Sequence, residues 1–143
     1  MQNRILLISL IVCGLFFISS CGMFGGDVDM EEGLYRITYK TEITGMPFPI
    51  PPFTLSQCLT KDNPVPDQSS KNQECKITNM QKSGDTVTWK MECTQRGGSM
   101  QASGTMTFKG DSLEGKTQMN MGPDAGNRVI TTYMKGKRVG PCG

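Results

Sequence analysis

The most reactive side chains in this 143-residue chain are those of six cysteines, because the sequence contains no histidine. Without an imidazole the chain cannot assemble a Ser-His-Asp triad, a Cys-His pair or a histidine-ligated zinc centre. A Ser-Lys dyad is the remaining hydrolytic alternative, but no S-x-x-K sequence occurs after the first 20 residues. The composition therefore predicts a protein that is not an enzyme, with no catalytic residues, no cofactor and no metal centre.

One segment matches a phosphate-binding motif. Gly110-Asp-Ser-Leu-Glu-Gly-Lys-Thr117 satisfies the P-loop pattern. A P-loop holds phosphate because its glycine loop leads into a helix whose N-terminal amides face the anion. Here Gly122 and Pro123 follow shortly after Thr117, so a helix of useful length does not fit. We therefore predict a turn at Gly110, an ordinary strand through Lys116, and no nucleotide binding.

The charge of the chain gives no support for a polyanionic partner. Its 15 Lys and Arg against 13 Asp and Glu give a net charge of +2. These residues are scattered and do not form the basic cluster that a nucleic-acid surface requires. The sequence therefore predicts no binding of nucleic acid.

The N-terminus resembles the signal peptide of a bacterial lipoprotein. Arg4 precedes an apolar run over residues 5–18, which is shorter than the roughly 20 residues of a membrane-spanning helix. The run ends in Ile18-Ser19-Ser20-Cys21, which is similar to a lipobox. The resemblance implies that residues 1–20 are removed and that Cys21 carries lipid. An uncleaved membrane helix and a soluble secreted protein cut elsewhere are the alternatives.

The same resemblance implies a location and a domain plan. Lipoproteins kept at the inner membrane usually carry Asp after the lipidated cysteine, and this chain has Gly22. We therefore expect a lipid-anchored protein that faces the periplasm from the outer membrane of a Gram-negative cell. Residues 21–32 are rich in Gly and acids and predict an unpacked tether. Residues 33–143 then form a single β domain.

Four cysteines remain after export and lipidation, and an oxidising compartment favours two disulfides. Residues 75–82 and 86–93 flank a turn centred on Gly84, which sets Cys75 opposite Cys93. Cys58 then pairs with Cys142 by elimination. A zinc site made by all four thiolates is the alternative, but the chain has no C-x2-C pair.

Methionine is the other abundant sulfur residue, with 11 in the chain. Soft thioethers suit Cu(I), and Met119 and Met121 share one face of a predicted strand. Met46 and Met100 are the methionines expected to be exposed and able to join such a site. The simpler interpretation is that the flexible thioethers of Met91, Met106, Met119 and Met121 fill an irregular core.

Most of the domain alternates apolar and polar residues with a period of two, which indicates half-buried strands. The alternation starts at residue 33, with Tyr35, Ile37 and Tyr39 on one face, and returns in residues 86–93, 100–108, 113–121 and 128–137. No segment has a sustained helical period. We predict an all-β fold with a single antiparallel meander sheet, strongly curved or barrel-like, stapled by two disulfides.

Residues 46–53 contain four prolines and cannot form a central strand. They predict an extended loop with two alternative roles. The loop covers the edge of the sheet, or it presents Phe48, Ile50 and Phe53 to an envelope protein partner or a small apolar ligand.

The chain resembles the bacterial domain-of-unknown-function 3617 family over residues 33–142. The residues that carry this likeness are Gly33-Leu-Tyr35, Gln57-Cys58, Cys75, Val87-Thr-Trp-Lys-Met-Glu-Cys93, Gly110-Asp-Ser-Leu-Glu-Gly115 and the ending Met134-Lys-Gly-Lys-Arg-Val-Gly-Pro-Cys142. Tyr35 stands where the family usually has Trp, and either ring serves as a core anchor. The resemblance implies a small exported protein of no established activity. A non-catalytic binding or envelope-structural module is therefore the leading expectation, and a copper-handling protein is the alternative.

Overall fold

The strands lie in one sheet. The computed structural model describes residues 27–95 and 98–143. The strands are β1 (Gly33–Ile43), β2 (Phe53–Leu59), β3 (Gln73–Ser83), β4 (Thr86–Gln95), β5 (Gly98–Lys109), β6 (Ser112–Asn120) and β7 (Val129–Gly140), and a short helical turn, η1, spans Pro123–Ala125. Neighbouring strands are antiparallel throughout, in the order β2-β1-β7-β6-β5-β4-β3. The predicted all-β antiparallel fold is confirmed.

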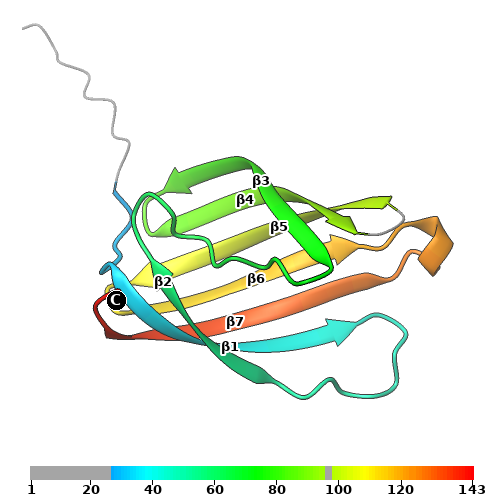
Figure 1. Ribbon diagram of the computed structural model, residues 1–143, viewed down its shortest axis with the longest axis horizontal. Helices are drawn as coiled ribbons and strands as arrows, with labels where there is room; N and C mark the ends of the chain where they lie inside the picture. The colour runs from blue at the N-terminus through cyan, green and yellow to red at the C-terminus, as the bar shows by residue number, and fades with distance from the viewer. Residues whose placement is uncertain (1–26, 96–97) are drawn as a thin grey trace, which may run out of the picture.

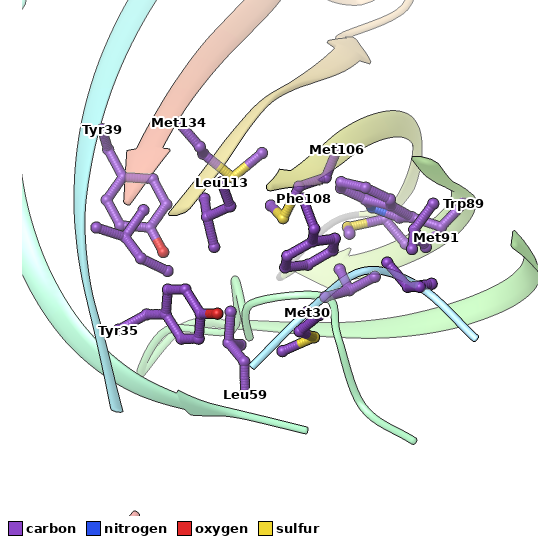
Figure 2. Packing of buried hydrophobic residues seen from close by; sticks show 14 of the residues in the cluster. Met30, Tyr35, Tyr39, Leu59, Trp89, Met91, Met106, Phe108, Leu113 and Met134 are labelled. Carbon is purple, nitrogen blue, oxygen red and sulfur yellow. The ribbon is translucent and has the colours of Figure 1, made fainter. Parts of the chain in front are cut away.

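The alternation along each strand separates a buried face from an exposed one. On β1, Tyr35, Ile37 and Tyr39 are buried while the residues between them face solvent. The same pattern on the other strands places Val87, Trp89, Met91, Met106, Phe108, Leu113 and Met134 in one core. Figure 2 shows the labelled side chains of this core, among them Trp89, Phe108 and Leu113, pointing into a common interior together with Met30 and Leu59.

The sheet curves into a half-barrel whose two edges are β2 and β3 (Figure 1). Residues 60–72, which we call the strap, connect these edges and cross the concave face. Pro64, Val65 and Pro66 of the strap are buried in the core. Val28 and Met30, in the first described segment, are also buried, at 2% and 5% exposure. The apolar interior therefore lies between the curved sheet and two irregular segments.

Residues 46–53 were expected to form an extended loop. In the structure Met46 and Phe48 are exposed at the β1–β2 connection, and Phe53 already belongs to β2. The prediction of an unpacked tether is wrong for residues 28–30. Met30 forms a bridge with Gly110, and two apolar side chains were enough to dock this short segment.

Both disulfides have the predicted connectivity. Cys75 lies directly opposite Cys93 in the β3–β4 hairpin, with Cα atoms 4.0 Å apart. The hairpin turns at Gly84, whose φ of 56° favours glycine. Cys58 on β2 bonds Cys142, with Cα atoms 5.4 Å apart. The second bridge joins an edge strand to the C-terminal residues.

Candidate binding site

The two ends of the half-barrel differ in how they are closed. At one end the Glu31 amide donates to the Gly110 carbonyl at 3.0 Å, and Arg138 Nε donates to the Glu32 carbonyl at 2.8 Å. The first described residues and the C-terminus both lie at this end, on the left of Figure 1. The opposite end carries the β1–β2 connection and η1. We call it the open end, because the contacts of Glu31 and Arg138 lie at the other end and do not close it.

A cavity of about 260 Å³ lies at the open end. We call it the methionine cavity, because Met100, Met119 and Met121 line it. Its other lining residues are Gln68, Gln73, Cys75, Gln95, Thr117, Ile130 and Thr132. None of these described side chains is charged, so the cavity is neutral with three thioethers and a polar rim.

The sheet register explains why these residues meet. Ala102 on β5 pairs with Met119 on β6, and Met119 pairs with Ile130 on β7. Met100 lies two residues before Ala102 and Met121 two residues after Met119, so both continue toward the open end. All these residues lie on the concave face because they are in phase with the buried Met106, Leu113 and Met134.

The strap forms one wall of the cavity. Gln68 Nε2 donates to Thr117 Oγ1 at 3.0 Å, which ties the strap to β6. Thr117 is the only polar residue of the described core, at 4% exposure, and this bond satisfies its hydroxyl. Sequence reasoning missed Gln68, Thr117 and Ile130 as lining residues. The Pro64-Val65-Pro66 sequence was the available signal that the strap docks on the sheet.

A second apolar feature lies along β2 and the loop before it. Phe48, Phe53 and Leu55, which we call the apolar edge, are 75%, 49% and 48% exposed. Phe53 stacks on Tyr39 with ring centroids 5.0 Å apart. Ile50, the third predicted binding residue, is half-buried. The structure therefore leaves two of the three predicted binding residues accessible and adds Leu55 to them.

Tyr39 connects the apolar edge to the core. Its hydroxyl is buried and has no hydrogen-bond partner among the described residues. Burial, together with the negative charge of Asp67, raises the pKa of Tyr39 to about 12. The phenol therefore stays neutral at physiological pH and cannot serve there as a base.

The remaining sequence candidates lie apart from these features. Cys21, the predicted lipidation site, falls outside the described residues. Lys116 and Thr117 lie within β6, so the P-loop pattern coincides with a strand as predicted. Met46 is exposed and does not line the methionine cavity. The described residues contain no cluster of His, Cys, Asp and Glu suited to a metal ion.

A larger hollow of about 660 Å³ lies nearby, lined by Lys90, Glu92, Gln101 and Ser103 among others. Several of these side chains belong to the solvent-facing side of β4 and β5. It therefore resembles an ordinary polar sheet surface more than a binding pocket.

Comparison with known proteins assigns the chain to a family. The description "protein of unknown function (DUF3617)" applies to residues 30–142, which include every strand, the strap and both disulfides. The chain belongs to the DUF3617 family. The DUF3617 match begins at Met30, the residue that docks on Gly110. No curated protein and no solved structure gives a significant match to this DUF3617 chain. In the described part, no helix is long and apolar enough to cross a membrane.

Proposed function

We propose that the protein is an exported lipoprotein, anchored through Cys21, whose β domain is a non-catalytic binding module of the cell envelope. The lipobox-like sequence supports the anchor. The fold supports the orientation, because Asp27 lies at the end of the half-barrel opposite the open end. Five residues lie between Cys21 and Asp27, and the six steps along the chain span roughly 20 Å at most. The open end therefore faces away from the membrane and into the periplasm.

The binding surface in this proposal is the apolar edge. Its exposed side chains sit on an edge strand that is paired only with β1. The sequence of β2, Phe-Thr-Leu-Ser-Gln-Cys-Leu, contains no charged residue, and its register with β1 has no bulge. Edge strands without charges or bulges are open to pairing with another chain.

The other edge of the sheet is protected. β3 carries Glu74, Lys76 and Lys82, and its register with β4 shifts between Ile77 and Asn79. Charges and bulges of this kind prevent pairing with a further strand. This contrast carries the proposal. The partner is an envelope protein that adds an extended, apolar segment to β2 and contacts Phe48 and Phe53.

Site-specific crosslinking in intact cells tests this proposal. A photoreactive amino acid at position 48 is expected to crosslink to one envelope protein. The same group at Tyr133, which is 41% exposed on the opposite face of the sheet, is expected not to reach it. Equal crosslinking from both positions, or none from position 48, would contradict the proposal.

A charge on the edge provides the second arm of the test. Leu55→Lys places an ammonium on β2, and we expect it to abolish the crosslink from position 48. Ile77→Lys is the matched control on β3, because Ile77 is 42% exposed and Leu55 is 48% exposed. The control is expected to keep the crosslink. A crosslink that survives Leu55→Lys in a folded protein would show that β2 is not the docking edge.

A further inference from the structure

Three methionines from two neighbouring strands meet in the methionine cavity. Met100 on β5 and Met121, which directly follows Asn120 at the end of β6, both line this cavity. Met119 precedes Met121 on the same face, about 6.5 Å along the strand. Because each side chain has three rotatable bonds, the three sulfurs can approach a common point inside the cavity.

Core filling accounts fully for other methionines and only in part for these three, since Met119 packs against the core and also lines the cavity. Met91 and Met106 are 3% and 1% exposed and pack fully within the core. Met100, Met119 and Met121 are only partly buried, and each faces the cavity. A side chain that lines empty space gains less from packing than one surrounded by atoms. Their shared position therefore calls for another explanation.

The donor set of the cavity selects one class of ion. Thioether sulfur is a soft, neutral ligand that suits Cu(I). The cavity offers no carboxylate or imidazole, and Cys75 is held in a disulfide. Harder divalent ions such as Mg²⁺ and Ca²⁺ lack their preferred oxygen ligands there. A monovalent ion also carries a smaller burial cost than a divalent ion in a neutral site.

We infer that the methionine cavity is a soft-metal site that takes one Cu(I) ion on the thioether sulfurs of Met100, Met119 and Met121. Ligation uses sulfur lone pairs, so no electron is transferred and no proton is released. The ion enters from the open end, and Gln68 holds the strap beside it through Thr117. This site is separate from the apolar edge, so either one can fail without the other.

Titration of the protein, purified as the cell makes it, tests the inference. The probes are Ag(I), which is redox-inert, and Cu(I) kept reduced with ascorbate. We expect one ion to bind with an affinity that stays constant from about pH 5 to about pH 8, because thioethers have no proton to lose. Bound Ag(I) is also expected to slow peroxide oxidation of Met100, Met119 and Met121 while Met46 oxidises as before.

Leucine variants separate sulfur chemistry from apolar packing. Leucine and methionine have similar volumes, so a Met100→Leu, Met119→Leu, Met121→Leu variant is expected to fold and to lose affinity by about tenfold or more. Met80→Leu is the control, because Met80 is 37% exposed and lies outside the cavity. Circular dichroism checks the fold of each variant.

The remaining outcomes each overturn the inference. Unchanged Ag(I) binding in the triple leucine variant would place the site elsewhere. Binding that weakens steeply as the pH falls would indicate titrating ligands such as carboxylates. An apolar fluorescent probe that binds the native protein and the triple variant equally, with no binding of Ag(I), would identify the cavity as a pocket for a small apolar ligand.

Discussion

Trp89 on β4 depends on the absence of a side chain on the neighbouring strand. It pairs with Gly104 on β5, and a Cβ at position 104 would overlap the indole. Trp89 itself is only 2% exposed, so its indole is packed within the core. The glycine therefore serves packing, because it makes room for the largest side chain of the core.

We expect Gly104→Ala to destabilise the fold by about 2 kcal/mol, because an extra methyl group in a packed core forces side chains out of position. Urea unfolding followed by the fluorescence of Trp89, the single tryptophan, measures this. Gly98→Ala on the same strand is the control, since no atom of the described residues lies within 4 Å of the place that its new methyl group would occupy. Equal stability of the two variants would show that the indole can move aside.

The buried phenol of Tyr39 links stability to high pH. Its pKa is about 12 in the folded protein and 10.0 when unperturbed. Between these values the phenol of the unfolded chain loses its proton first. The contribution of Tyr39 to the free energy of unfolding is therefore fully present below pH 10 and is lost as the pH rises toward 12. We expect native protein to lose about 2 kcal/mol over this interval relative to Tyr39→Phe.

The same variant should not be destabilised near neutral pH, because it removes a buried hydroxyl that has no partner among the described residues. Chemical denaturation of both proteins across the pH range provides the measurement. Parallel pH profiles would mean that Tyr39 is accessible to water in the folded state.

The two disulfides constrain loops of different length. Cys58 and Cys142 are separated by 84 residues, and Cys75 and Cys93 by 18. The entropy of the unfolded chain then predicts losses of about 4.5 kcal/mol for Cys58→Ser with Cys142→Ser and about 3 kcal/mol for Cys75→Ser with Cys93→Ser. Thermal or urea unfolding of the two double variants checks the order. A larger loss from the short loop would show that native-state packing outweighs loop closure.

Local elements were predictable where the sequence itself carries the constraint. The β3–β4 hairpin followed from Gly84, and the alternation on β1, β4, β5, β6 and β7 followed from their apolar residues. β2 was missed as a strand because it adjoins four prolines and most of its residues are exposed.

The identity of the covering segment required tertiary information. Residues 46–53 and the strap both contain prolines and both could cover the sheet, and residues 46–53 have the larger apolar side chains. Pairing between β1 and β7 decides which segment covers the concave face, because it leaves β2 and β3 as the two edges of the sheet. A segment that joins the two opposite edges must cross the concave face, whereas residues 44–52 only connect the neighbouring strands β1 and β2. The methionine cavity depends on the same non-local pairing and on the position of the strap.

At the scale of the whole molecule, Asp27, where the described chain starts, and the open end lie at opposite ends of the half-barrel. Leu55 and Phe53 pair with Ile37 and Tyr39, four to six residues into β1, so they lie roughly 13 to 20 Å from the start of that strand. We expect Cys21→Ala to release the protein from the membrane fraction, because the thioether-linked lipid cannot form. Fractionation with immunodetection, and mass measurement of the mature chain, report the result. An unchanged membrane association of the variant would mean that another segment holds the protein there.

The way the chain enters the sheet also determines how the fold bears mechanical load. From Asp27 the chain runs through the short segment docked on Gly110 and then into β1, which is hydrogen-bonded to β2 on one side and β7 on the other. Tension applied at Asp27 along this strand loads both ladders in shear, so many hydrogen bonds resist together. The bridge from Cys58 on β2 to Cys142, just beyond β7, keeps the flanking strands from parting. A domain stretched between a bilayer and a bound partner would therefore keep its fold under forces that open a hairpin one bond at a time.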